Sequence, residues 1–261
     1  MLRHGGWGVA LRAFFDETGT HDGHPLTAVA GFVFDGAGLD KFEADWRKRT
    51  ADFKEPFHTV DCVNGRGQFK GWPEPQRLLL MHDLPEIIIQ TRICGFLSFI
   101  ESNEYDQWCK ENPRYVSWIG SPYTVCLMKC VETAGLVARQ NQFEGDIDYV
   151  FESGCDKQEE AAEFMLRLDK NPKLKAGLRV GKWGFSPKKS ELALCAADFL
   201  CWEWQRNYVQ ATQNLADVSW NPRSEFKILL SPNPTEIYHQ RISKENLSSQ
   251  AMTNAAHGIH V

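Results

Sequence analysis

Residues 10–19 read ALRAFFDETG, and this stretch decides the fold that the sequence predicts. The run 10–15 is mostly apolar, is interrupted only by Arg12 and stops at turn-forming residues, which is typical of a buried strand. Asp16 and Glu17 follow at once, so the strand delivers two carboxylates at its carboxyl end. Because successive strand residues point to opposite faces, we expect one of the two to face a site. Asp-Glu before Gly19 is also good turn chemistry, and that alternative stays open.

Outward from this stretch, strand-like and helix-like segments alternate. A second strand is predicted at residues 26–34, and a turn leads from it into a helix over residues 39–53, whose apolar residues recur at helical spacing. Further strands are predicted at residues 91–100, 146–151 and 178–185, and further helices at residues 76–81, 121–141, through Phe164 and Leu168, and 191–208. This order predicts an α/β protein with a mixed five-stranded sheet flanked by helices on both faces.

The chain is expected to form one α/β domain over residues 1–212 with a C-terminal extension over residues 213–261. Within the domain, no Pro/Gly/Ser-rich linker separates two independently patterned halves. The extension is rich in Asn, Ser and Pro, so we expect it to be partly irregular, with one strand at residues 226–230 and poorly ordered last residues. Residues 56–75 are also expected to be irregular.

The composition indicates a soluble protein of the cytoplasm with no membrane contact. Of the 261 residues, 43% are hydrophobic and 24% are charged, which is ordinary for a globular protein. The eight cysteines include no Cys-x-x-Cys pair, so we expect buried, reduced thiols and no structural zinc site of the usual spacing. The N-terminus lacks the apolar core of a secretory signal, and no window is apolar enough for a membrane span.

The charge is acidic overall, with one basic segment. A net charge of −5 argues against a protein that coats nucleic acid over its whole surface. Residues 170–189, however, hold seven Lys or Arg side chains and no acid. Lys182, Lys188 and Lys189 are therefore candidate contacts to nucleic-acid phosphates. The alternative interpretation is that the basic residues of this segment lie on a solvated loop and strand edge and bind nothing.

Two further acids are notable for their places in the pattern. Glu152 ends the strand 146–151, and in open α/β sheets ligands collect outside the carboxyl ends of the strands. The alternative is that Glu152 only caps the following helix or is solvated in the loop. Asp198 lies inside an apolar helix beside Leu194 and Trp202, where a carboxylate needs a cation, a hydrogen-bond network or a raised pKa. A structural network with a backbone amide or an Arg is the alternative for Asp198.

Acids from three separate elements are what a divalent Mg²⁺ or Mn²⁺ ion requires. The predicted metal ligands, which are also the predicted catalytic residues, are Asp16, Glu152 and Asp198, and Glu17 is a candidate fourth ligand. With two such ions, a nuclease can activate water and stabilise the leaving oxygen of a phosphodiester. His58 and Asp61 are candidates for a general acid or base, or for a further ligand. No Walker loop, His-Glu-x-x-His or Gly-x-Ser-x-Gly motif points elsewhere.

Four short motifs lie within residues 11–208. They are Asp-Glu-Thr-Gly at residues 16–19, Val-Ala-Gly at residues 29–31, a middle loop with His58, and Cys-Ala-Ala-Asp at residues 195–198. Together they resemble a family of bacterial and phage proteins catalogued as domain of unknown function 3800. That family's usual motifs are Asp-Glu-Ser-Gly and Gln-x-x-Asp, so Thr18 and Cys195 depart from it. The resemblance implies a ribonuclease-H-like fold and, by analogy, a metal-dependent nuclease.

The sequence leaves three functions open. The first is a metal-dependent nuclease or phosphodiesterase acting on DNA or RNA. The second is a non-catalytic binding or assembly protein with the same fold, whose partners contact exposed aromatic anchors; the candidates are Trp183, Trp202, Trp204 and Trp220. The third is a phosphotransferase or hydrolase of a small phosphorylated molecule, which would have a closed pocket where a nuclease needs an open groove.

Overall fold

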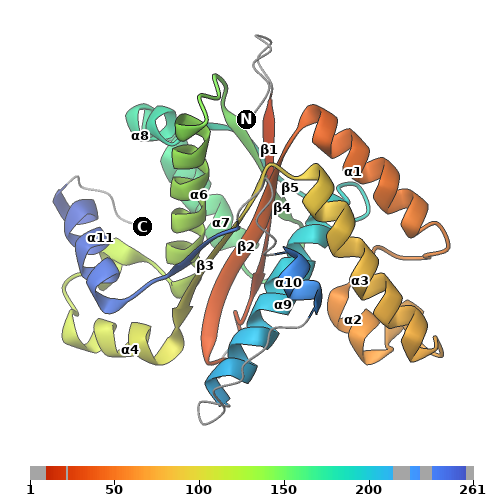
Figure 1. The fold of residues 1–261 in the computed structure, drawn as a ribbon. Helices are drawn as coiled ribbons and strands as arrows, with labels where there is room; N and C mark the ends of the chain where they lie inside the picture. The colour runs from red at the N-terminus through yellow and green to blue at the C-terminus, as the bar shows by residue number, and fades with distance from the viewer. Residues whose placement is uncertain (1–9, 22, 214–223, 230–236, 257–261) are drawn as a thin grey trace.

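A mixed sheet of six strands forms the centre of the molecule (Figure 1). The structure is a computed structural model, which describes residues 10–21, 23–213, 224–229 and 237–256. The strands are β1 Leu11–Thr18, β2 Leu26–Asp35, β3 Cys94–Glu101, β4 Ile147–Glu152, β5 Val180–Ser186 and β6 Ile237–Arg241. Their order across the sheet is β5-β4-β1-β2-β3-β6. Strand β2 is antiparallel to β1 and β3, whereas the β1–β4, β4–β5 and β3–β6 pairs are parallel.

The central strands β1 and β2 are buried on both faces. Strand β1 places Phe14 in one hydrophobic core and Ala13 and Phe15 in the other, as the alternation of a strand requires. On β2, a Cβ atom at Gly31 would lie 2.0 Å from the carbonyl oxygen of Phe14, so the close pairing of these strands requires glycine there. The carboxyl end of β1, with Asp16, is thereby fixed in the middle of the sheet.

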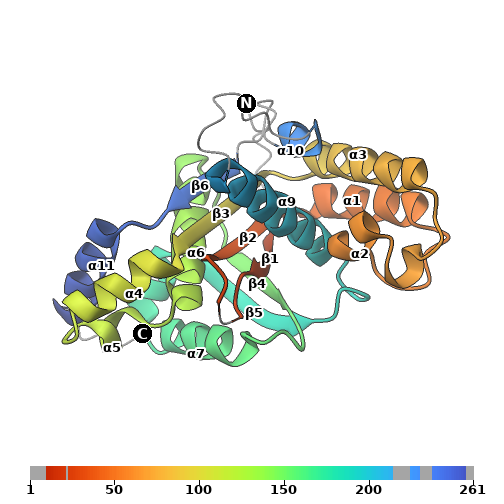
Figure 2. The ribbon, with the colours of Figure 1, turned by 90° about the horizontal axis from the view of Figure 1, so that it is seen from below.

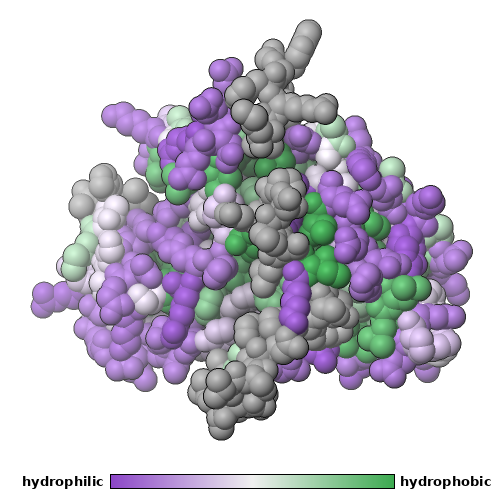
Figure 3. Space-filling view, viewed as in Figure 1, coloured by the Kyte–Doolittle hydropathy of each residue, from purple (hydrophilic) through white to green (hydrophobic). Residues whose placement is uncertain are grey.

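Helices cover both faces of the sheet, as Figure 2 shows. One face carries α1 Gly36–Arg49, α2 Thr59–Asn64, the short 3₁₀ helix η1 Gly67–Phe69, α3 Glu74–Thr91, α9 Ala193–Gln213 and α10 Ser224–Leu229. The other face carries α4 Ser102–Glu111, α5 Val116–Ile119, α6 Pro122–Gln140, α7 Gln158–Asp169, α8 Pro172–Gly177 and α11 Lys244–Ala256. Hydrophilic side chains dominate the outer helices in Figure 3. Over the described residues, no helix combines the length and apolar character that crossing a membrane demands.

The predicted α/β class, a mixed sheet with helices on both faces, is confirmed. The predicted strand number is wrong, because β6 adds a sixth strand at the edge next to β3. Residues 56–75 are not wholly irregular, since α2 and η1 lie there; elements of one or two turns carry too little periodicity to be recognised. All eight cysteines, each in the described part of the chain, are free.

The C-terminal residues complete both the sheet and the cores. The strand predicted at residues 226–230 is wrong: α10 lies there, because Phe226 and Leu229, three residues apart, bury the same side of a helix against α3. On the other face, Ile242 and Leu247 are fully buried in the core that α6 shares with β1. Trp220 and the predicted disordered end at residues 257–261 lie outside the described residues.

Candidate active site

Three carboxylates meet at the carboxyl ends of β1 and β4. These strands are parallel neighbours, with Phe15 paired to Phe151, so the next residues, Asp16 near the end of β1 and Glu152 at the end of β4, lie side by side. Helix α9 packs across β1 and β2 and brings Asp198 to the same place from the helical layer. Asp16 and Asp198 are 7% and 9% exposed, so water does little to stabilise their charges. The predicted grouping of these acids is therefore what the fold assembles.

The ammonium group of Lys188 lies at the centre of this cluster. Its Nζ is 2.7 Å from Glu152 Oε2, 3.3 Å from Asp16 Oδ2 and 3.3 Å from Asp198 Oδ1. Lys188 follows β5, the neighbour of β4, and its residue is only 9% exposed. It therefore does not lie on an exposed basic face, where a phosphate contact was expected. Lys182 and Lys189 are exposed side chains outside the cluster.

Asp198 is held by the segment that precedes and begins α2. Its Oδ2 accepts hydrogen bonds from the backbone N–H of Thr59 at 2.8 Å and from the Thr59 hydroxyl at 2.5 Å. Its Oδ1 faces Lys188 and the Nε2 atom of His58, which is 3.4 Å away. The other ring nitrogen of His58, Nδ1, is 3.6 Å from Asp61 Oδ2. His58 and Asp61 thus lie at the edge of the cluster, with their side chains 45% and 38% exposed.

Burial and mutual repulsion perturb the carboxyl groups on β1. Burial raises the pKa of Asp16 to about 6; the Lys188 ammonium opposes this rise, and the carboxylates of Asp198 and Glu152 add to it. Burial and the Asp16 carboxylate raise the pKa of Glu17 to about 7, against a hydrogen bond from the Cys155 thiol. The backbone N–H of Glu17 donates to Asp16 Oδ1 at 2.9 Å. Glu17 is therefore adjacent to the three carboxylates but does not contact Lys188 Nζ in an ion pair.

The cluster also fixes the charge of Lys188. Burial alone would lower the pKa of its amine, but the carboxylates of Asp198, Asp16 and Glu152 outweigh it, so the pKa lies above its ordinary value. Lys188 is therefore an ammonium ion at neutral pH. Two buried acids, the half-buried Glu152 and one cation leave the cluster with an excess of negative charge, which a more highly charged cation would neutralise better.

The chemistry of the three carboxylates fits a divalent cation, although their oxygens are not at metal-binding distances from one point. Among the described residues, no group of three or more His, Cys, Asp or Glu side chains has the spacing of a metal centre. The carboxylate oxygens instead surround an ammonium at 2.7–3.3 Å, farther than the roughly 2.0–2.6 Å of Mg²⁺ or Ca²⁺ ligands. Hard carboxylate oxygens from three elements that already converge on one cation are nevertheless the ligands such ions prefer.

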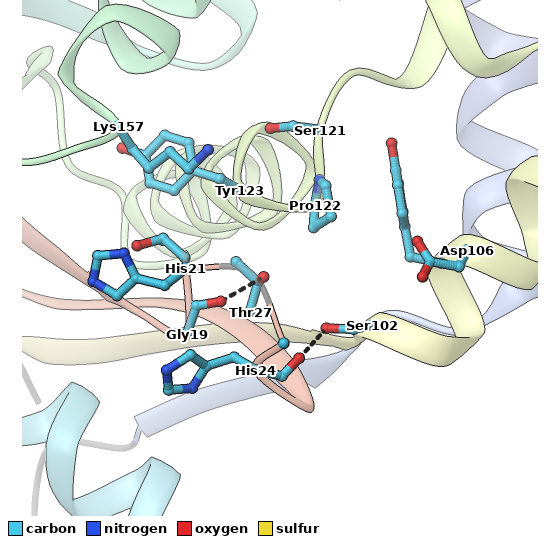
Figure 4. Close-up of a pocket in the computed structure, with 13 residues that line it drawn as sticks. Gly19, His21, His24, Thr27, Ser102, Asp106, Ser121, Pro122, Tyr123 and Lys157 are labelled. Atoms are coloured by element: carbon cyan, nitrogen blue, oxygen red, sulfur yellow. Dashed lines mark hydrogen bonds between the residues drawn. The ribbon is translucent and has the colours of Figure 1, made fainter.

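A pocket with a volume of about 380 Å³ opens at the carboxyl edge of the sheet, and none of the four cluster residues lines it (Figure 4). Gly19, which follows β1, and Ser102, which follows β3, are part of its lining. Burial and, after it, the carboxylate of Glu17 raise the pKa of Tyr123, which also lines the pocket. In Figure 4, Lys157, Tyr123 and Ser121 lie on one side of the residues drawn, and Gly19, His21 and His24 lie on the other. The pocket is therefore a separate feature on the same edge of the sheet as the cluster.

Comparisons with known proteins give a likeness in fold and none in sequence. No protein-family model matches the chain, so the resemblance to domain of unknown function 3800 stays a hypothesis. No curated protein matches it in sequence. Among solved structures, the crystal structure of Bst-RNase HIII in complex with Mn²⁺ is similar, with 12% identity and a TM-score of 0.43. The alignment covers 96% of this chain and 71% of that chain.

Two residues of the site escape prediction from the sequence. Thr59 and Cys155 are small side chains in loops or short helices, and nothing in their neighbourhood distinguishes them. Lys188 was predicted as a phosphate contact, but its place among the acids was not predicted. The signal that could have found its place is positional, because it lies two residues beyond the end of β5 and ten before Asp198, at the edge where the acids collect.

Proposed function

We propose that the protein hydrolyses nucleic-acid phosphodiester bonds at a Mg²⁺ or Mn²⁺ site held by carboxylates. The observation that supports this function is the convergence of Asp16, Glu152 and Asp198, from β1, β4 and α9, on one cation within 3.3 Å. Such convergence of buried acids requires a compensating charge, and hydrolysis of a phosphodiester by divalent ions asks the protein for carboxylates and little else.

The ion would be held by Asp16, Glu152 and Asp198, with Glu17 available beside them. Bound there, a divalent cation supplies Lewis-acid polarisation of a phosphoryl oxygen and lowers the pKa of water. The buried positions of Asp16 and Asp198 keep bulk water away from these oxygens, which strengthens their interaction with any cation. Thr59 fixes one oxygen of Asp198, so the other is directed at the centre of the site.

His58 is proposed to move the proton that hydrolysis requires. Its Nε2 faces the cluster and its Nδ1 faces Asp61, so the carboxylate of Asp61 orients the ring. The side chain is half-exposed, which lets it exchange a proton with solvent or with the leaving oxygen of the substrate. Asp61 itself does not face the cluster, and it acts as a positioning residue for the imidazole.

Exposed basic residues are proposed to guide the nucleic acid. Within the segment 170–189, Lys175 pairs with Asp169 and Arg179 donates to the carbonyl oxygen of Gly145, so these two cations have partners within the fold. Lys182, in β5, and Lys189, in the turn after β5, are exposed and are the proposed phosphate contacts. Contacts of this kind add affinity without sequence preference, and salt weakens them.

Cleavage of fluorescent DNA and RNA oligonucleotides tests the proposal. We expect the wild-type protein to cleave one of them with Mn²⁺ or Mg²⁺ and not with a chelator. Glu152→Gln should abolish cleavage, because it removes a charge that contacts the central cation. Asp156→Asn is the matched control, since Asp156 lies after the same strand but is exposed and pairs only with His21 in an ion pair. Equal cleavage by wild type and Glu152→Gln would contradict the proposed site.

A non-catalytic binding protein is the second candidate. The observation that favours it is the neutralisation of the acids by Lys188, which makes the cluster a structural ion network without any metal. Three of its four proposed aromatic anchors lie among the described residues, and they are less exposed than that role requires: Trp204 lies in the core, and Trp183 and Trp202 pack against the two cores. This function predicts that no oligonucleotide or metal changes the behaviour of the protein.

A further inference from the structure

Lys188 stands at the place where a metal ion would have to bind. Its Nζ contacts one oxygen of each of the three candidate ligands, at 2.7–3.3 Å, and its side chain is 10% exposed. The side chains of Asp16 and Asp198 are 9% and 11% exposed and that of Glu152 is 26% exposed, so the cluster is largely buried and opens to solvent at Glu152. Without the ammonium, three carboxylates would face one another there with no cation between them.

The Lys188 ammonium and a divalent cation cannot bind these oxygens at the same time. Ligand oxygens lie roughly 2.0–2.6 Å from Mg²⁺ or Ca²⁺, so an ion bound by the same oxygens would overlap the position of Nζ. Even at about 4 Å, like charges repel strongly in a buried site of low dielectric. The incoming ion therefore has to displace the side chain of Lys188.

The surrounding chain allows this displacement. Residues 188–190 form a turn between β5 and α9, and the flanking Pro187 and Lys189 are exposed. The Lys188 side chain enters the cluster from this surface turn on a flexible four-carbon stem. A change of side-chain rotamer can carry the ammonium back toward solvent while the strand and the helix stay in place.

We propose that Lys188 is a built-in counter-ion, which occupies the metal position in the metal-free protein and competes there with the divalent cation. This inference rests on the proposed function, because it presumes that the carboxylates bind a metal. Two consequences follow. The lysine stabilises the empty site, and it weakens metal binding, since binding must first break three ion pairs.

Metal binding and thermal melting of Lys188→Met test the inference without any activity assay. We expect the metal-free variant to melt at a lower temperature than wild type, because its carboxylates have lost their cation. Calorimetric titration should show about tenfold or greater tightening of Mn²⁺ binding, since no ammonium is displaced. Mn²⁺ should then raise the melting temperature of the variant more than that of wild type.

Two further variants serve as controls. Lys189→Met removes the neighbouring, exposed lysine and should leave Mn²⁺ affinity and melting as in wild type. Lys188→Arg keeps a cation at the centre and should not tighten Mn²⁺ binding. If Lys188→Met does not fold without metal, Lys188→Gln, which keeps polar contacts to the carboxylates, replaces it, and recovery of folding by Mn²⁺ supports the inference.

The possible failures are distinguishable. If wild type binds Mn²⁺ and Lys188→Met binds it equally or more weakly, the counter-ion role is overturned while the proposed function stands. If neither protein binds Mn²⁺ at millimolar concentration, the metal site itself is refuted and the inference falls with it. Binding by Lys188→Met alone would support the counter-ion role and contradict metal-dependent hydrolysis by the wild-type protein.

Discussion

Thr59 donates two hydrogen bonds to the same oxygen of Asp198, one from its backbone N–H at 2.8 Å and one from its hydroxyl at 2.5 Å. Thr59 is fully buried and Asp198 nearly so, which makes charge-assisted bonds of this kind strong. The pair orients the carboxylate, because Oδ2 is satisfied by α2 and Oδ1 is left to face Lys188 and His58. A segment far from α9 in sequence thus determines how Asp198 enters the site.

Thr59→Val should lower stability by about 1–3 kcal/mol, because it removes the hydroxyl and leaves a buried carboxylate oxygen with one donor fewer. Thr59→Ser keeps the hydroxyl and is expected to remain close to wild type. Urea denaturation of the three proteins measures the difference. If the Val and Ser variants have the same free energy of unfolding, the hydroxyl does not hold Asp198.

Asp198→Asn should reduce cleavage roughly a hundredfold or more, because it removes a charged ligand from the site. The fold should survive, since the amide oxygen of Asn can still accept both hydrogen bonds from Thr59. Single-turnover cleavage and thermal melting are measured on the same preparation. Retained cleavage would remove Asp198 from the proposed ligands, and a large loss of stability in the metal-free protein would favour the structural network.

His58→Gln should reduce the rate of cleavage by about 10²–10⁴-fold while leaving Mn²⁺ affinity nearly unchanged, as expected for a proton-transfer residue that is not a ligand. Asp61→Asn should have a smaller effect and should change the pH dependence of the rate, because it removes the acceptor that faces Nδ1. Rates across pH and calorimetric Mn²⁺ binding separate the two roles. Loss of Mn²⁺ binding in His58→Gln would instead identify His58 as a ligand.

The acids of the site were predictable because each has a signal within its own segment. Asp16 and Glu152 follow apolar strands directly, and the carboxyl ends of parallel strands meet at one edge. Asp198 stands out as a carboxylate among apolar helical neighbours. Lys188 and Thr59 carry no such signal. Thr59 matters through its hydrogen bonds to Asp198, which is distant in sequence, and Lys188 matters through a side chain that points inward from a surface turn.

Prediction of the fold from the sequence fails for the same reason. The central strands were predictable from apolar runs, but β6, with the sequence IYHQR, is half polar because it lies at the edge of the sheet. Phe226 and Leu229 were read as part of a strand, whereas packing on α3 selects a short helix. In both places tertiary contacts, which local sequence does not encode, decide the structure.

Raised carboxyl pKa values make the metal-free protein less stable as the pH rises. The pKa of Asp16 is raised from 3.8 to about 6 and that of Glu17 from 4.5 to about 7, so the folded state binds more protons than the unfolded state between these values. Stability is then greatest below about pH 4 for these groups and falls until about pH 7.

Urea denaturation with a chelator, compared at about pH 5 and about pH 8, measures this loss. In the double variant Asp16→Asn/Glu17→Gln, which cannot titrate at these positions, the difference should be much smaller. An equal pH dependence in the two proteins would show that other groups cause it.

Truncation after Gln213 should destabilise the protein severely. It would remove β6, uncover the edge of β3 and delete Leu229, Ile242 and Leu247, each fully buried. Burial of each such side chain is worth about 1.5–3 kcal/mol, so the loss approaches the whole stability of an ordinary domain. Circular dichroism melting of the truncated chain is the measurement. A cooperative transition near that of the full chain would show that residues 1–213 fold alone.

Calorimetric titration of Mn²⁺ into the wild-type protein and into Asp16→Asn shows whether the carboxylate cluster binds a metal. Asp16 lies near the end of the central strand β1 and contacts the same cation as Glu152 and Asp198. We expect saturable binding to wild type that is lost in the variant. No binding at millimolar Mn²⁺, or equal binding by both proteins, would contradict a metal-dependent hydrolase at this site.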